Sequence, residues 1–311
     1  MTRHAKASLD VIRDLDPVAD YQAIYDRLLF VDAASTMAAG LNLAFYRSFA
    51  APNIATLLAS TRVAIDEPVQ RATDTAVLVW EMVMHGFDHE RGRAALKRMN
   101  RIHSAFSIAN EDYLYVLSAI VVVPILFMDR YGWRRAFEHE RIASAEFYRE
   151  MGRRMGLRDI PADFAEFEAY MQDYERANFV FTDQARELIA ATTSLMDHRV
   201  PKPLRGAVGM LTSTLMDRRM RAAAGVRNPP PGLATAVRVA VRTASRIARR
   251  RNPNPAHRFP TGVVTLPAYS DGYRLEQVGH HPERTDQPDP PQCRGSERQH
   301  EPATFSATDR R

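Results

Sequence analysis

Apolar residues recur at intervals of three and four along most of the chain, and no run alternates convincingly between apolar and polar positions. The first pattern is that of one face of an α-helix, whereas alternation would indicate a β-strand. Proline and glycine interrupt the pattern where helices are expected to begin or end. The sequence therefore predicts an all-α protein, with helices near residues 9–15, 21–31, 37–49, 54–58, 67–86, 89–108, 110–132, 134–155, 159–174, 182–196, 204–224 and 233–251.

The chain divides into three parts by composition. Residues 1–228 carry nearly all the helical patterning and are predicted to form a single multi-helix globular domain. After a break rich in proline, residues 229–251 form a basic amphipathic helix. Residues 252–311 are rich in proline and charge and poor in aliphatic side chains, so burial there cannot offset the entropy lost on ordering. We predict a disordered C-terminal tail.

The longest apolar run, Leu114 to Met128, has 15 residues and contains Pro124. Because a bilayer-spanning helix needs about 20 residues, we interpret the run as a buried helix. The first ten residues lack an apolar core of signal-peptide length. Cys293 is the only cysteine, which excludes an intramolecular disulfide. We therefore expect a cytoplasmic protein with no signal peptide or transmembrane helix, and peripheral membrane contact remains open.

Basic charge is concentrated in one segment. The net charge is +5, but residues 199–251 alone hold 13 Lys and Arg against Asp217. Helical spacing places Arg238, Arg242, Arg246 and Arg249 on one face. A basic helix of this kind over 233–251 is typical of contact with anionic lipid, and a solvated terminal helix is equally compatible. Aromatic residues do not interleave with the basic ones, so we expect no nucleic acid partner.

Three residues are the strongest candidates for chemistry. Arg71 and Thr75 lie one helical turn apart, so both side chains can point to the same place. His103 follows among small and apolar neighbours, and residues 113–128 supply an apolar helix. A cation, a hydroxyl and an imidazole beside an apolar helix suit a flat apolar cofactor held by a nitrogen ligand. Haem is the leading candidate.

Two other groups of titratable residues resemble metal sites. The first, with four-residue spacing, is Glu81, His85 and His89; because Gly86 interrupts it, we predict a solvated helix end. The second is Glu140, Glu146 and His139. A carboxylate-bridged di-iron bundle needs Glu-x-x-His pairs on two helices, which the sequence lacks. We predict that this second group lies on an exposed face.

The order of motifs resembles the rubber-oxygenase (latex-clearing protein) and MpaB family. The likeness covers roughly residues 45–226, and while each motif alone is weak, the ordered set is moderately specific. The segments that carry it are Arg71-x-x-x-Thr75, Arg101-Ile102-His103, Tyr113-Leu114-Tyr115-Val116-Leu117, Asp129-Arg130-Tyr131-Gly132, Glu140, residues 147–152, Gly156 and Pro161.

The resemblance implies an all-helical catalytic domain that binds haem b. It places the iron ligand at His103, with Arg71 and Thr75 in the pocket to bind a haem propionate or orient oxygen. It implies a haem-b-dependent oxygenase-like oxidoreductase that acts with dioxygen on a hydrophobic, isoprenoid or lipid-like substrate. Fold-level likeness does not fix function, so the activity is a hypothesis.

Two departures from the rubber oxygenases argue against polyisoprene cleavage by the same mechanism. Asp74 stands where some relatives have a lysine as second iron ligand, and residues 53–57 lack the carboxylate that relatives carry upstream of the arginine. Two local alternatives also stay open: His103 hydrogen-bonded to a carboxylate or carbonyl, and Arg71 paired with Glu67. The alternative function is a non-enzymatic haem- or lipid-binding helical protein associated with a membrane surface.

Overall fold

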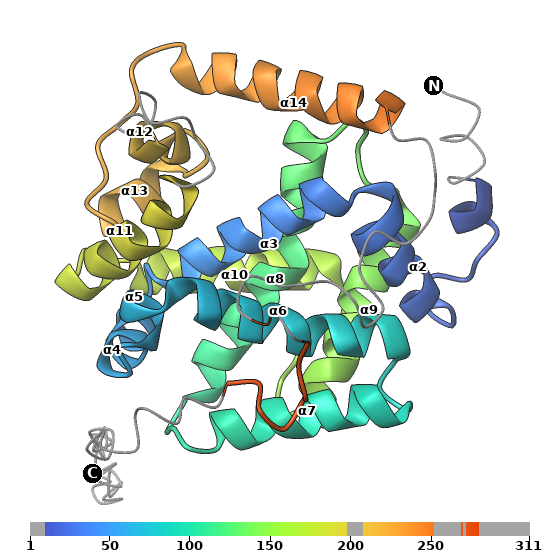
Figure 1. Cartoon of the computed structure of the whole chain (residues 1–311). Helices are drawn as coiled ribbons and strands as arrows, with labels where there is room; N and C mark the ends of the chain where they lie inside the picture. The colour runs from blue at the N-terminus through green and yellow to red at the C-terminus, as the bar shows by residue number, and fades with distance from the viewer. Residues whose placement is uncertain (1–9, 198–207, 252–268, 270–271, 280–311) are drawn as a thin grey trace, which may run out of the picture.

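The computed structural model describes residues 10–197, 208–251, 269 and 272–279. The regular structure in these ranges is helical, which confirms the predicted all-α class (Figure 1). In chain order the helices are α2 (Tyr21–Arg27), the π-helix η1 (Leu28–Asp32), α3 (Ala34–Ser48), α4 (Pro52–Ser60), α5 (Val63–Asp66), α6 (Pro68–His85), α7 (Glu90–His103), α8 (Asn110–Tyr131), α9 (Glu138–Arg154), α10 (Phe164–Asn178), α11 (Asp183–Asp197), α12 (Val208–Ser213), α13 (Arg218–Ala223) and α14 (Leu233–Arg251).

The boundaries differ from the predicted ones at a few places. Helix α5 was not predicted, because a single turn is too short to show periodicity. Helix α7 ends at His103 rather than near residue 108, and the Ser104 hydroxyl donates to the carbonyl of Arg101 at its end. The predicted helix over 204–224 is divided into α12 and α13, and the Asp217 carboxylate caps α13. Residues 204–207 lie outside the described residues.

Helix α8 is the central element of the fold. It has 22 residues and is long and apolar enough to cross a bilayer, but 72% of its apolar window is buried inside the protein. Helices α3, α9 and α10 pack around it (Figure 1). Burial of this extent is the pattern of a core helix, which agrees with the interpretation made from the sequence.

A glycine lets α3 approach α8 closely. A Cβ at Gly40 would lie 2.4 Å from the Cα of Pro124 and 3.2 Å from the Cβ of Phe127. Pro124 sits inside α8 and cannot donate the usual helical hydrogen bond. The flat, small surface of α3 at Gly40 therefore lies against the proline, and this contact fixes α3 along the central helix.

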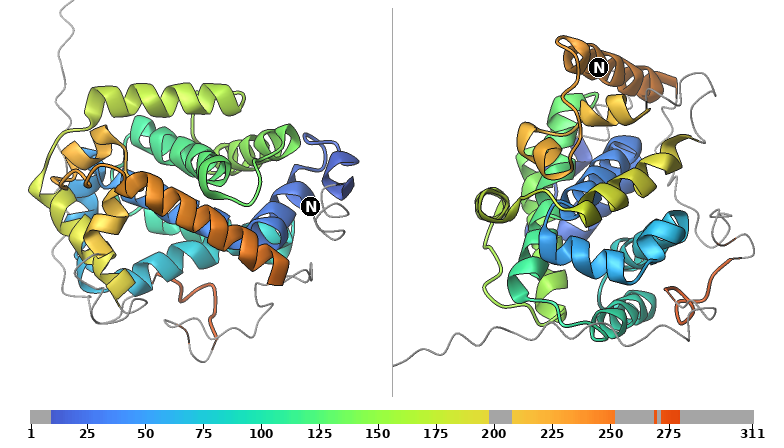
Figure 2. Two further views of the ribbon diagram at one scale, coloured as in Figure 1. Left: turned by 90° about the horizontal axis from the view of Figure 1, so that it is seen from above. Right: turned by 90° about the vertical axis from the view of Figure 1, so that its left-hand side faces the viewer.

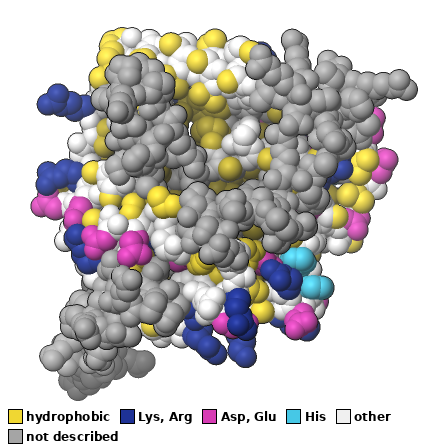
Figure 3. Space-filling view, viewed as in Figure 1, with side chains coloured by type: hydrophobic (Ala, Val, Ile, Leu, Met, Phe, Trp, Pro, Cys, Tyr) yellow, Lys and Arg dark blue, Asp and Glu magenta, His cyan; other side chains and the backbone are white. Residues whose placement is uncertain are grey.

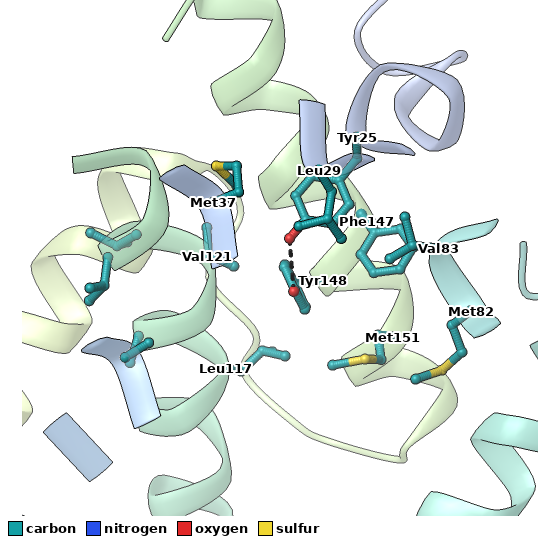
Figure 4. Close-up of a cluster of buried hydrophobic side chains, with 14 of the residues drawn as sticks. Tyr25, Leu29, Met37, Met82, Val83, Leu117, Val121, Phe147, Tyr148 and Met151 are labelled. Atoms are coloured by element: carbon teal, nitrogen blue, oxygen red, sulfur yellow. Dashed lines mark hydrogen bonds between the residues drawn. The ribbon is translucent and has the colours of Figure 1, made fainter. Parts of the chain in front are cut away.

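The densest part of the core joins α2 to α9. The ring of Tyr25 stacks on Phe147 with centroids 4.9 Å apart, and the Tyr25 and Tyr148 hydroxyls lie 2.9 Å from one another (Figure 4). All three side chains are fully buried. A buried hydroxyl is costly unless it is hydrogen-bonded, so the two tyrosines satisfy each other.

Buried ion pairs connect helices that are distant in sequence. The guanidinium of Arg47 on α3 binds Glu175 on α10 and, at 2.7 Å, the carboxylate of Asp217. Glu140 is likewise buried: Arg134 donates to both its oxygens, and one oxygen also accepts from the backbone N–H of Phe137. The prediction that Glu140 lies on an exposed face is therefore wrong.

Two C-terminal features complete the described structure. Helix α14 lies along one side of the molecule beside α8 (Figure 2). Tyr269 and residues 272–279 are an exception within the tail predicted to be disordered, because they pack against α6 and α7. The other residues of the predicted tail lie outside the described residues.

Candidate functional site

Helices α6 and α7 form an antiparallel pair that carries the three candidate residues. Gly86 ends α6 with φ +77°, a backbone conformation that favours glycine. In the first turn of α7, a Cβ at Gly92 would lie only 1.8 Å from the carbonyl oxygen of Gly86, so no larger residue fits there. Because the pair is antiparallel, the first turns of α6 lie beside the last turns of α7.

Arg71 and Thr75 on α6 contact each other, as their spacing predicts. The Arg71 guanidinium donates to Oγ1 of Thr75, and the Thr75 hydroxyl in turn donates to the Arg71 carbonyl at 3.2 Å. Burial lowers the pKa of the Arg71 guanidinium, although the nearby charge of Asp74 acts in the opposite direction. Among the described residues no carboxylate, including Glu67, lies within ion-pair distance of Arg71. A half-buried cation with no carboxylate partner favours an anionic ligand.

His103 occupies the last turn of α7. Its Nδ1 is buried and has no hydrogen-bond partner among the described residues. Burial lowers the pKa of the imidazole to about 4, and the positive charge of Arg71 adds to the effect. The edge of the ring faces Tyr113 of α8, with centroids 5.5 Å apart. Among the described residues, no carboxylate or carbonyl forms the alternative hydrogen bond to Nδ1.

Arg71 in the first turn of α6 and His103 in the last turn of α7 lie at the same end of the helix pair, and the charge of Arg71 lowers the pKa of His103. We call Arg71, Thr75 and His103 the candidate site. Their chemistry fits a haem: a neutral imidazole is the form that ligates a metal, and a half-buried guanidinium matches a propionate. The unsatisfied Nδ1 supports this fit, because a buried polar atom without a partner calls for an explanation.

Asp74, the neighbour of Thr75 in the sequence, accepts hydrogen bonds within the protein. Its carboxylate is buried, and Oδ1 accepts hydrogen bonds from Gln70 at 2.7 Å and from the hydroxyl of Tyr269 at 2.5 Å. Asp74 therefore acts as an acceptor for the C-terminal segment.

The four-residue spacing of Glu81, His85 and His89 has a structural explanation. Glu81 is almost fully buried, so the predicted solvated helix end is wrong for this residue. Its carboxylate binds Arg91 at 2.8 Å, and it accepts from the Tyr273 hydroxyl at 2.5 Å. His85 and His89 stack with centroids 5.0 Å apart. Within the described ranges, no group of three or more His, Cys, Asp or Glu residues forms a metal site.

The side chains of the apolar helix predicted over residues 113–128 differ in their distance from the candidate site. Tyr115 and Met128 are fully buried in the core, and the Tyr115 hydroxyl donates to Glu175 at 3.2 Å. Only Tyr113 of that group contacts the candidate site. A separate cavity of about 250 Å³ is bounded by Arg149, Arg153, Leu157, Asp159 and Ile160, and none of the three site residues lines it.

Sequence reasoning did not identify Tyr269 and Tyr273 as partners of α6. Both donate to buried carboxylates that lie two helical turns apart, Asp74 and Glu81. The available signal was local: Tyr269, Tyr273, Leu275 and Val278 lie close together in a tail that has few aromatic and aliphatic side chains. That signal was outweighed by the composition of the tail as a whole.

Comparison with known proteins identifies related sequences. A family model described as "ER-bound oxygenase mpaB/B'/Rubber oxygenase, catalytic domain" matches residues 29–248, a range that contains the candidate site and ends before Tyr269. An "ER-bound oxygenase mpaB'" from Penicillium brevicompactum is 27% identical over 250 residues, which cover 74% of this chain and 59% of that protein. The chain therefore spans less than two thirds of this relative.

Two further relatives give similar values. An "ER-bound oxygenase mpaB" from Penicillium roqueforti (strain FM164) is 29% identical over 199 residues, or 58% of this chain and 66% of the relative. An "ER-bound oxygenase mpaB" from Penicillium brevicompactum is 28% identical over 193 residues, or 56% of this chain and 49% of the relative. The shared part of each relative is thus between about half and two thirds of its length.

The environment of His103 predicts an unusual titration. We expect its imidazole to titrate near pH 4 in nuclear magnetic resonance spectra of the haem-free protein, well below the ordinary 6.5. Between these values the unfolded chain binds more protons than the folded one, so His103 lowers stability as the pH falls through this window. Denaturation of His103→Leu protein should show a smaller loss of stability over the same range. An imidazole that titrates near 6.5 would contradict the burial described here.

Proposed function

The chain belongs to the ER-bound oxygenase mpaB/B'/rubber oxygenase family, and on this basis we propose that it is a haem-b-dependent oxygenase that acts with dioxygen on a hydrophobic substrate. The resemblance expected from the ordered motifs is confirmed by the match over residues 29–248. The observation that carries the proposal is the buried, unsatisfied Nδ1 of His103 beside the guanidinium of Arg71. An imidazole and a cation in one environment provide what a haem needs from the protein.

Each residue of the candidate site has a defined role in this proposal. His103 would ligate the iron, and its neutral state at physiological pH leaves a lone pair available. Arg71 would bind a propionate, or stabilise negative charge that develops on oxygen. Thr75 holds the guanidinium in place because its Oγ1 accepts a hydrogen bond from Arg71. The same hydroxyl donates its proton to the Arg71 carbonyl. Haem, when bound, supplies the iron chemistry that activates dioxygen, while the protein supplies orientation and electrostatics.

The substrate class follows from the family and from two local departures. Helix α4, which covers residues 53–57, has no carboxylate, and Asp74 is bonded to Gln70 and Tyr269. A mechanism that needs an upstream base or a lysine ligand therefore lacks its residues here. We propose oxidation of an isoprenoid or lipid-like molecule, without the polyisoprene cleavage of the rubber oxygenases.

We also propose that α14 contacts the membrane that holds such a substrate. Val239 and Ile247 are exposed by 59% and 44%, and Ala236, Ala240 and Ala244 are exposed beside them. In the view of Figure 3, hydrophobic side chains line a hollow in the upper half of the molecule, the half that contains α14. Exposed apolar side chains on a basic helix favour an interfacial position on anionic lipid.

The arginines that the helical spacing places on one face of α14 differ in their exposure. Arg246 is exposed, whereas Arg238 and Arg242 are half-buried on the side toward the body of the protein. The Nε of Arg242 is buried with no partner among the described residues. The side chain of Arg249 lies outside the described residues. The apolar stripe would therefore enter the lipid, with arginines at its border near the headgroups.

The first prediction concerns haem binding. Protein expressed with a haem precursor should show a Soret band, and His103→Ala should weaken haem affinity by more than the roughly 10- to 100-fold cost of losing an outer-shell partner. His139→Ala, which removes an imidazole on α9 that contacts the Ile12 carbonyl, is the matched control and should keep the band. Oxygen consumption with isoprenoid or unsaturated lipid substrates then distinguishes an enzyme from a carrier. An unchanged spectrum in His103→Ala protein would overturn the ligand assignment.

The second prediction concerns the membrane. The full chain should float with phosphatidylserine-containing vesicles at low salt and be released as screening increases. Val239→Asp with Ile247→Asp should reduce binding by at least about tenfold, because burial of two such side chains in lipid is worth several kcal/mol. The control pair Val18→Asp with Val180→Asp changes equally exposed valines elsewhere. Equal binding of wild-type and α14-variant protein would refute membrane contact through α14.

A further inference from the structure

A short C-terminal segment, Tyr269 with residues 272–279, lies along α6 and α7 (Figure 1). It follows the range matched by the family model, which ends at residue 248. The segment forms no helix, so its position depends on contacts with the two helices. We call it the C-terminal strap.

The strap binds α6 through two tyrosine hydroxyls. Tyr269 donates to Oδ1 of Asp74 at 2.5 Å, and Tyr273 donates to Oε1 of Glu81 at the same distance. Asp74 and Glu81 are seven residues apart and therefore on one face of α6. The two tyrosine rings also contact each other, with centroids 5.8 Å apart.

The two hydrogen bonds matter for stability because the carboxylates that accept them are buried. Asp74 and Glu81 are only 3% and 1% exposed, and a buried carboxylate is costly without donors. Burial raises the pKa of both phenols, and the hydrogen bonds to the carboxylates raise it further, so the tyrosines remain donors at physiological pH. Asp74 also acts on the neighbouring Arg71 through its charge.

The far end of the strap binds α7. The side chain of Val278 is fully buried, and its carbonyl accepts from Nε of Arg98 at 2.7 Å. Gly279 has φ +71°, and a Cβ there would lie 2.8 Å from Cδ1 of Ile102. Ile102 precedes His103 directly. The strap therefore touches α6 next to Thr75 and α7 next to His103.

We propose that the C-terminal strap positions α6 against α7, with Tyr269 and Tyr273 as positioning residues for the candidate site. It connects the helix that carries the cation and the hydroxyl to the helix that carries the imidazole. The consequence for haem binding rests on the proposed function, whereas the consequence for helix packing does not. A segment outside the range matched by the family model thus supports a site whose three residues all lie inside that range.

The test compares Tyr269→Phe, Tyr273→Phe and the double variant in the full chain. Each keeps the ring and removes one hydroxyl, so the fold is retained. The control is Tyr21→Phe, because the Tyr21 hydroxyl has no hydrogen bond among the described residues and its ring packs on Phe147. Hydrogen–deuterium exchange reports local opening of α6 and α7, and haem titration reports the site.

We expect amide exchange in α6 and the last turns of α7 to accelerate by roughly 10- to 100-fold in each single variant, because a hydrogen bond to a charged group is worth roughly 1.5–3 kcal/mol. Exchange in α9 and in Tyr21→Phe protein should match wild type. Haem affinity should fall in the strap variants. Unchanged exchange in α6 and α7, or equal acceleration throughout the protein, would overturn the proposal. If exchange accelerates in the strap variants but the wild-type chain never binds haem, the positioning role of the strap stands and the proposed haem-dependent function is refuted.

Discussion

The close contact between Gly86 and Gly92 is the constraint on which the candidate site depends. A Cβ at Gly92 would meet the Gly86 carbonyl oxygen at 1.8 Å, so the two helices can approach this closely only with glycine there. The turn sets the antiparallel register, and the register brings the start of α6 to the end of α7. Arg71 and His103, 32 positions apart in the sequence, thereby come to share one electrostatic environment.

Buried charge on α6 explains why the site differs from the rest of the helix. Oδ1 of Asp74 accepts hydrogen bonds from Gln70 and Tyr269, and the Glu81 carboxylate accepts from Tyr273 and Arg91. Arg71 has the Thr75 hydroxyl but no described carboxylate at ion-pair distance. Helix α6 therefore carries two carboxylates bonded within the protein and one cation, Arg71, that can still bind an anionic ligand. On the neighbouring helix α7, Nδ1 of His103 has no hydrogen-bond partner among the described residues.

Sequence periodicity predicted most of the helices, since helical burial repeats every three or four residues, but it did not reveal the single turn α5 or the division between α12 and α13. The site residues came from spacing and from the family resemblance. Burial of individual charges could not be predicted, because it depends on partners: Glu140 is buried through Arg134, and Glu81 through Arg91 and Tyr273. The C-terminal strap was not predicted for a related reason. A few tyrosines and aliphatic residues gain their binding energy from α6 and α7, which the composition of the tail does not reveal.

The central claim is that His103 presents its imidazole to a haem iron within the α6–α7 pair. Electron paramagnetic resonance of haem-loaded protein, labelled with ¹⁵N only in histidine, tests this most directly. We predict hyperfine coupling to one histidine ¹⁵N that is absent from the His103→Ala spectrum and present when any other histidine is replaced. Coupling that survives the loss of His103, or that disappears with another histidine, would contradict the account.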